Sequence, residues 1–404
     1  MKILTTYNNL KSNWYKRKKF LETKGLSGYI RNSNGYVLAI VLIVSTLLIA
    51  LASEFATVSM TSIRYMRNFD NRLKSLTLAR SGMELSKYIL AMDQRGVSAT
   101  FLTGKKTNRN VDCYDDIWAI DFPPFTVGDG QITIKIEDEQ SKVNVSVLAN
   151  EFSPQTKFYP IIQRLMINLG YPMDIADAIL DWVDINEIRS PYGAESDHYE
   201  NLPIPYKSKN YALDSINELL MVKGITPEIF YGLKKTATIE GILVDHNRGY
   251  TGIDLNKLNS MSDIDSETKD GFKDQYENQK KKIGKEKSKS LSHYLRVHGS
   301  RQDAYSSYNK ININTASYRV ISALTDKMTD DIVTEIISKR QVQPFTTVSE
   351  LSSYIDDPTF RDLALTVKSD LFRIKVTGTV DNVSSTIIAV YDRSRRRYLY
   401  WCSQ

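Results

Sequence analysis

The stretch YVLAIVLIVSTLLIALA, residues 36–52, has 17 residues without a charged side chain. This is the lower length limit for a helix that crosses a bilayer, and no other run in the 404-residue chain is comparable. Residues 1–35, the leader, carry eight Lys and Arg against one Glu, so the leader holds +7 and the rest −1 of the total charge of +6. Because positive charge keeps the flanking side in the cytoplasm, the stretch predicts a membrane anchor, with the chain from Glu54 onward translocated.

The overall composition is typical of a globular protein of two or three domains. Hydrophobic residues make up 42% and charged residues 25% of the chain, and there are two cysteines. These values exclude a disordered chain, a collagen and a disulfide scaffold. The charge of +6 invites a nucleic-acid function, but the positive excess lies in the leader. An alternative for the anchor is a secretory signal cleaved near Ala50-Leu51-Ala52.

The anchor is expected to continue as one amphipathic helix to about Leu90. No proline occurs from Tyr36 to Phe122, and apolar residues recur at helical spacing. They are Met66, Phe69, Leu73, Leu76, Met83 and Leu90. A helix of about 55 residues would be about 80 Å long. An anchor followed by a separate helix explains the same periodicity.

Strand patterns lie at both ends of the remaining chain. Residues 131–136 and 143–147 alternate apolar and polar side chains and predict a hairpin, with a turn over 137–142. Three more strands are predicted at 371–380, 385–391 and 397–401. More than 200 residues of helical pattern separate the two groups. The sequence therefore predicts an α+β fold, in which one antiparallel sheet carries a large helical insertion.

The insertion is expected to contain two helical modules. The first includes helices at 158–169 and 174–183, and a helix-turn-helix at 216–233 with Pro227 early in its second helix. The second follows the entry Ile-Asn-Ile-Asn-Thr-Ala at 311–316 and ends with a helix that starts at the capping box 347–350. Both resemble helix-hairpin-helix or SAM-like modules.

The acidic loop, residues 171–201, holds eight acids and one base. Its candidate ligands are the oxygens of Asp181, Asp184, Asn186, Glu195 and Asp197. Oxygen-only ligands of mixed charge in a loop suit calcium rather than zinc or copper. The alternative is a solvated acidic loop with Trp182 in the core. The spacing is not that of an EF-hand.

Three other features have simpler interpretations. Residues 280–301 carry eight bases and one acid and predict a solvated connector, or else a contact to acidic lipids or an acidic partner. A Cys113–Cys402 disulfide and two separate thiols are both open on the translocated side. The four histidines show no ligand spacing, and no nucleophile elbow or phosphate loop is present, so we do not expect an enzyme.

The residues before the anchor provide a family resemblance. Gly35 after a basic leader resembles the type III signal of type IV pilins and pseudopilins, which implies cleavage by a prepilin peptidase after Gly35 and methylation of Tyr36. Most members have Glu at the fifth mature position, but here it is Ile40. A buried carboxylate is costly unless paired, and its absence is typical of the minor pseudopilin K of type II secretion. Residues 136–145, the entry at 311–316 and the acidic loop, which binds calcium in relatives, also resemble that family.

The resemblance implies a minor pseudopilin at the tip of a type II secretion pseudopilus, which initiates or caps assembly. It implies an inner-membrane anchor, a periplasmic head, I-like and J-like minor pseudopilins and the major pseudopilin as partners, and no nucleic acid. The alternative is a membrane-anchored helix-hairpin-helix DNA receptor of a competence or type IV pilus system. The expected divisions are a leader (1–35), an N-terminal helix (36–92, with 36–52 in the membrane), a sheet (93–150 and 366–404), a first SAM-like module (151–240), a connector (241–307) and a second SAM-like module (308–365).

Overall fold

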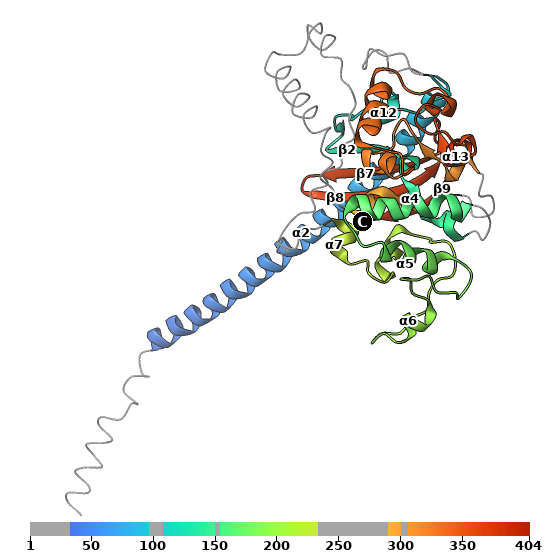
Figure 1. Ribbon diagram of the computed structural model, residues 1–404. Helices are drawn as coiled ribbons and strands as arrows, with labels where there is room; N and C mark the ends of the chain where they lie inside the picture. Colours follow the sequence, from blue (N-terminus) through green and yellow to red (C-terminus); the bar gives the residue numbers. More distant parts are fainter. Residues whose placement is uncertain (1–32, 97–107, 150–153, 233–289, 300–305) are drawn as a thin grey trace, which may run out of the picture. The chain divides into compact units, whose positions relative to one another are not determined.

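The computed structural model describes residues 33–96, 108–149, 154–232, 290–299 and 306–404 (Figure 1). The leader, apart from its last three residues, and most of the predicted connector lie outside these described residues. The chain divides into two compact units, Met1–Asp70 and Asn71–Gln404, which are treated separately below.

Helix α2 runs without interruption over Ser33–Gln94, 62 residues, as the periodicity predicts. Its segment from Tyr36 is long and apolar enough to cross a membrane. The helix ends at Gln94, and Gly96 just after it has a positive φ of 78° and donates its N–H to the carbonyl of Asp93. The predicted apolar face is correct only in part. Met83 and Leu90 are fully buried, whereas Met66, Phe69 and Leu73 are exposed.

The sheet has five antiparallel strands in the order β1-β2-β7-β8-β9. Their bounds are β1 Phe125–Val127, β2 Gly130–Asp138, β7 Leu371–Val380, β8 Val383–Asp392 and β9 Arg397–Ser403. The α+β fold and four of these strands confirm the prediction, whereas β1 was not predicted. The hairpin with residues 143–147 is wrong, because β2 pairs with β1 and β7 instead. Only Val143–Asn144 form a strand there, β3, which pairs in parallel with β4, Leu295–Arg296.

Small residues let the second half of α2 lie close against the sheet. Ser75, Ala79 and Ser86 are fully buried on the helix face that packs with Met83 and Leu90. On the sheet side, a Cβ added to Gly378 would lie 2.1 Å from the carbonyl oxygen of Ser75. Side chains of β2, β7 and β8 complete this core with Trp118. Glycine at 378 is therefore required by the close approach of two backbones.

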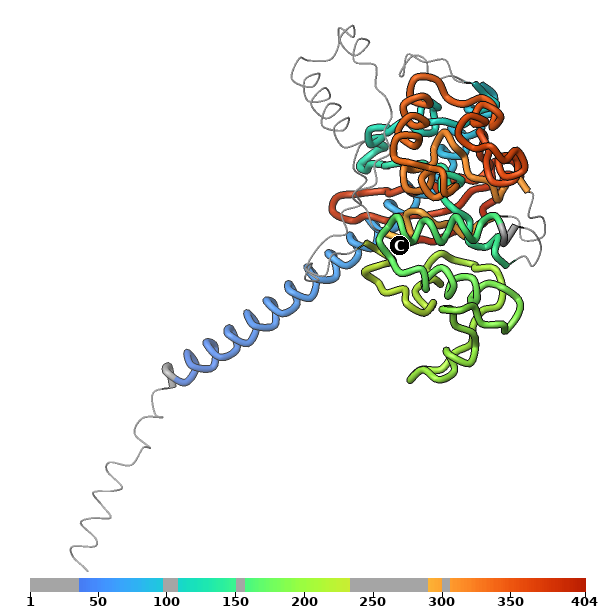
Figure 2. The backbone as a smooth tube through the Cα atoms, viewed as in Figure 1, coloured from blue at the N-terminus to red at the C-terminus, as the bar shows by residue number. Residues whose placement is uncertain are grey.

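The chain leaves the sheet after β2 and returns at β7, and the described residues between these strands form the insertion (Figure 2). Its α-helices are α4 Pro154–Leu169, α5 Asp174–Val183, α6 Ser196–Glu200, α7 Pro227–Tyr231, α10 Leu291–Tyr294, α11 Tyr318–Ser322, α12 Asp330–Val342 and α13 Pro358–Ala364. Its 3₁₀ turns are η3 Glu139–Ser141, η4 Val145–Ala149, η5 Ile216–Met221, η6 Ser307–Asn309 and η7 Val348–Leu351, and its remaining strands are β5 Ile311–Asn312 and β6 Leu365–Thr366. A further turn, η2 Ile117–Ala119, precedes the sheet.

The two predicted modules share one hydrophobic core. Buried side chains of α4, α5 and α7 belong to the same cluster as those of α11, α12 and α13. Arg164 of α4 also donates from Nε and Nη2 to the carbonyls of Ala323 (2.8 Å) and Leu324 (2.6 Å) after α11. Local patterns delimit helices but do not report which helices pack together. The predicted division at residues 240 and 308 therefore does not separate two cores.

Residues 290–299 are not a solvated connector, and the prediction was wrong there. Leu291, Tyr294 and Leu295 are fully buried in the insertion core. Arg296 is also fully buried, and its guanidinium donates to the carbonyls of Lys142 (3.2 Å) and Tyr308 (2.8 Å), among others. The charge pattern misled because a buried arginine and a solvated arginine look alike in sequence. The rest of the basic stretch lies outside the described residues.

Candidate functional site

The acidic loop follows helix α5, which the structure gives the predicted bounds, Asp174–Val183. One side of α5 carries Ile175, Ile179 and Trp182 into the core. Asp181 is also fully buried, and Asp184 ends the helix with its backbone N–H on the carbonyl of Leu180. The helix therefore holds two of the predicted ligands at its carboxyl end, one turn apart.

Backbone contacts fold the loop back onto these acids. Both Asp181 oxygens accept the Ser190 N–H at 3.1 Å. A Cβ added to Gly193 would lie 1.9 Å from Asp181 Oδ2, so only glycine allows the loop to cross there. Asp177, one turn earlier, accepts the Tyr192 N–H at 3.1 Å and the Tyr159 hydroxyl. Asp177 was not among the predicted residues, and its role is to position the loop.

Glu195 is a buried acid of the loop. Its side chain is 2% exposed, and Oε1 accepts no hydrogen bond. Burial, together with the nearby charges of Asp181, Asp184 and Glu187, raises the pKa of Glu195 to about 8. A carboxyl group that is buried among other carboxylates is stabilised in its charged form by a cation.

Two residues that the sequence did not single out complete this group. Glu187 Oε1 accepts hydrogen bonds from Asn210 Nδ2 at 2.7 Å and from the Ser196 hydroxyl at 3.0 Å. Asn210 has a left-handed backbone, with φ of 48°, and its N–H bonds the Trp182 carbonyl at 3.0 Å. Its Oδ1 is buried and accepts no hydrogen bond. Asn210 thus adds a second oxygen without a donor near the carboxylates.

The structure brings together only some of the predicted ligands. Asp181 and Asp184 lie close enough to Glu195 for their charges to raise its pKa. Asn186 Oδ1 instead accepts the Ile188 N–H at 2.7 Å within its own turn. Asp197 is exposed on α6. The aromatic rings of Trp182, Tyr199 and Tyr206 pack against one another beside the loop. The available donors are oxygens, which fits a hard cation such as calcium.

The remaining predicted residues lie elsewhere. Tyr36 and Ile40 are exposed on α2, at 64% and 42%. Cys113 is buried, Cys402 is half-buried on β9, and both are free thiols, so the disulfide is absent. Burial raises the pKa of the Cys113 thiol, which makes this thiol unreactive.

An apolar N-terminal helix whose continuation packs on an antiparallel sheet defines the pseudopilin class, here with a large insertion between β2 and β7. Residues 141–240 and 311–368 match family models described as "Type II secretion system (T2SS), protein K". In these two regions the chain is similar to protein K of the type II secretion system. This family is a structural component of a secretion apparatus and not an enzyme class.

Similar proteins agree with this assignment. The type II secretion system protein K of Pectobacterium carotovorum subsp. carotovorum is 27% identical over 206 residues, 48% of this chain and 60% of that relative. The protein K of Aeromonas hydrophila is 25% identical over 214 residues, 50% of this chain and 61% of the relative. The matched region thus spans about 60% of the length of these relatives. A chain in the crystal structure of the GspK-GspI-GspJ complex from enterotoxigenic Escherichia coli has a TM-score of 0.51, at 15% identity, covering 86% of this chain and 99% of that chain.

Proposed function

We propose that this chain is the subunit at the tip of a type II secretion pseudopilus, where it initiates or caps assembly. The observation that carries the proposal is Ile40 in an anchor segment, residues 36–52, that contains no acidic residue. A subunit inside the filament would have to supply a carboxylate in the bilayer for the N-terminal amine of the subunit above it. A subunit with nothing above it does not need this costly group.

The proposed location is the inner membrane, with the residues after the anchor in the periplasm. The continuous apolar helix from Tyr36 is consistent with a single-pass anchor. The partners we propose are the I-like and J-like minor pseudopilins, because the fold resembles a chain of the GspK-GspI-GspJ complex, together with the major pseudopilin. A membrane-anchored DNA receptor stays the alternative prediction. The function proposed here includes no nucleic-acid partner.

Cleavage after Gly35 is the first test. Mass spectrometry of the chain from cells with a prepilin peptidase should give a mature N-terminus at methylated Tyr36. Substitution of Gly35 by Asp should leave the leader attached, because the peptidase requires the small residue at the cut. The matched change Gly28→Asp should leave cleavage intact. An intact leader in the wild type, or a cut near Ala52, contradicts the assignment of the anchor.

The position in the filament is a second test of the same proposal. Antibody fragments against the insertion should label one end of each pseudopilus in electron micrographs. Labels spaced along the filament length would show that the chain is an interior subunit, which removes the tip role but leaves the family unchanged.

Calcium at the acidic loop is part of the proposal. The fit rests on the buried Glu195 Oε1 and Asn210 Oδ1, which accept no hydrogen bond, and on a donor set made of oxygens. Asp184, Glu195 and Asn210 would hold the ion, with Glu187 beside them. Bound calcium would supply positive charge to carboxylates that repel one another. Asp181 and Asp177 would keep their present contacts and position the loop.

Calcium should slow hydrogen exchange in the acidic loop. A ligand at 100 times its Kd stabilises the bound state by about 2.7 kcal/mol, so local opening of residues 184–198 should become about 100-fold rarer. The measurement is hydrogen exchange by mass spectrometry on the full chain in detergent, with and without calcium. Glu195→Gln should abolish the effect, whereas the matched Glu200→Gln, at an exposed position on α6, should retain it. Equal exchange in the wild type with and without calcium would rule out the site.

A further inference from the structure

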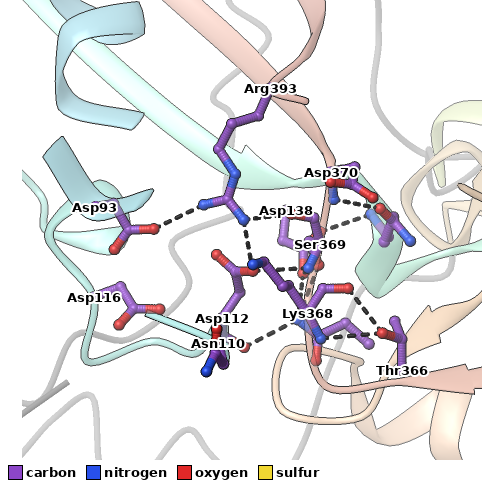
Figure 3. Close-up of polar contacts among 12 residues, drawn as sticks. Asp93, Asn110, Asp112, Asp116, Asp138, Thr366, Lys368, Ser369, Asp370 and Arg393 are labelled. Atoms are coloured by element: carbon purple, nitrogen blue, oxygen red, sulfur yellow. Dashed lines mark hydrogen bonds and ion pairs between the residues drawn. The ribbon is translucent and has the colours of Figure 1, made fainter. Parts of the chain in front are cut away.

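A second group of acids lies at the sheet end of α2, away from the acidic loop in sequence. Asp93 is in the last turn of α2, and Asp112 and Asp116 flank Cys113 in the segment before η2 (Figure 3). One oxygen of each lies within 4.8 Å of the other two. Among the described residues, no other group of three potential metal ligands converges this closely. All three residues are at least nine-tenths buried, with exposed fractions of 8% for Asp93, 1% for Asp112 and 1% for Asp116.

The existing hydrogen bonds use only part of these carboxylates. Arg393, in the turn after β8, donates to Asp93 Oδ2 and to Asp112 Oδ2, both at 2.7 Å. The Ser369 N–H also donates to Asp112 Oδ2, at 2.8 Å. The Cys113 N–H donates to Asp116 Oδ2 at 2.7 Å.

The second oxygen of Asp112 is the independent sign of a ligand. Asp112 is 99% buried, and its Oδ1 is also buried but accepts no hydrogen bond. Figure 3 shows this carboxylate directed toward Asp93 and Asp116, on the side away from Ser369. A buried carboxylate oxygen without a donor is costly, and its orientation puts it where the other two acids converge.

One guanidinium does not balance three carboxylates. Arg393 is the nearest cation, and Lys368 acts on Asp93 more weakly. Burial, followed by repulsion from the neighbouring acids, raises the pKa of Asp93 to about 7 and that of Asp116 to about 8. These directions agree with the geometry, since a further positive charge is what the three ionised groups lack.

We propose that Asp93, Asp112 and Asp116 bind a divalent cation, and that the cation is calcium. Calcium binds oxygens at 2.3–2.6 Å, so two ligands on opposite sides of the ion are separated by about 5 Å at most. Ligand atoms that all lie within 4.8 Å of one another can therefore reach one calcium ion, and a donor set of carboxylate oxygens suits calcium. Backbone carbonyls or water complete the coordination.

The cation would join three separate parts of the fold. Asp93 belongs to the end of α2, and Asp112 and Asp116 belong to the segment before the sheet. Arg393, in the turn between β8 and β9, donates to Asp93 and Asp112. The ion therefore holds the docked end of the helix to the sheet. This role does not depend on the acidic loop or on the position of the subunit in a filament.

The test measures calcium on the full chain in detergent, after removal of metal with a chelator. A background variant, Glu195→Gln, eliminates the acidic-loop site. In that background we expect one calcium per chain by metal analysis after equilibrium dialysis, with Asp112→Asn and Asp116→Asn at least tenfold weaker. The matched Asp129→Asn, at an exposed turn position, should bind as the background does. No calcium on the folded background variant overturns the proposal, whatever the Asp variants do.

Terbium supplies a local readout that does not require a ligand substitution. Trp118 is buried two residues after Asp116 and is among the groups that act on its carboxyl. Terbium in the proposed site should therefore emit when tryptophan is excited, and calcium should quench that emission by displacement. Trp118→Phe should remove most of the signal in the Glu195→Gln background, whereas Trp182→Phe should not. Emission that follows Trp182 instead would assign the ion to the acidic loop and overturn the second site.

Discussion

Replacing Glu139 by Gln should lower the free energy of unfolding by about 3–5 kcal/mol, the range expected when one partner of a buried ion pair is removed. Glu139 is fully buried in η3, directly after β2. Arg373 donates to both of its oxygens at 2.9 Å, and Lys142 Nζ lies 3.2 Å from Oε2. Without the carboxylate, two positive charges would face each other at the base of the insertion.

Denaturant unfolding of the full chain in detergent measures this effect. The matched control is Glu137→Gln, the same change two residues earlier. Glu137 pairs with Lys135 at 2.5 Å, but its side chain is 35% exposed, so its loss should cost less than about 1 kcal/mol. Similar losses for the two variants would contradict a buried ion pair at Glu139.

The same pair predicts a pH dependence. Arg373 and Lys142 hold the pKa of Glu139 well below its usual range, despite burial. A carboxyl group whose pKa is depressed in the folded state stabilises it above the unfolded pKa, about 4.3, and loses that contribution as the pH falls. The difference in stability between the wild type and Glu139→Gln should therefore shrink from pH 5 to pH 3. A constant difference would mean that the charge of Glu139 is not responsible.

Features set by local chemistry were predictable from the sequence. Strand β7 and residues 385–389 of β8 alternate buried and half-buried side chains, and the sequence shows the same alternation of apolar and polar residues. Helix α5 has a distinct apolar face and the predicted bounds. The capping box of Thr347 and Glu350 is present because it depends on two residues three positions apart.

Residues 143–147 show why alternation alone can mislead. Val143, Val145 and Val147 are buried, as in a strand, but so are Asn144 and Ser146 between them. Asn144 Nδ2 donates to Asn309 Oδ1 at 2.9 Å, 165 residues away. Because this distant partner allows the polar side chain of Asn144 to be buried, the segment has no solvent-exposed face. It continues as the 3₁₀ turn η4 rather than as a strand.

The candidate sites divide in the same way. Asp181, Asp184 and Glu195 are close in sequence, so their composition indicated a cation before the structure placed them. Asp93 and Arg393 are 300 residues apart, and their contact depends on α2 docking onto the completed sheet. No spacing rule reaches that far, which is why the second group of acids was not predicted.

Replacing Gly378 by Ala should cost about 3 kcal/mol, the upper part of the range for overpacking a core. The added Cβ would lie 2.1 Å from the Ser75 carbonyl oxygen and 2.8 Å from the Ala79 backbone nitrogen. These are backbone atoms of a helix, so no side-chain rotation relieves the overlap. The helix has to move away from β7, and the buried pair of Ser75 and Ser385 hydroxyls, 2.7 Å apart, has to separate.

The control for Gly378→Ala is Gly128→Ala, in the turn between β1 and β2. A Cβ there meets nothing within 4 Å, and the only penalty comes from its φ of +57°, about 1–2 kcal/mol. Hydrogen exchange separates the two causes of destabilisation. Gly378→Ala should reduce the protection of residues 71–94 while the core of α4 and α5 stays protected, whereas Gly128→Ala should leave the helix protected. Unchanged protection of residues 71–94 in Gly378→Ala would mean that the helix does not lie against β7, because a methyl group cannot occupy that contact without displacing it.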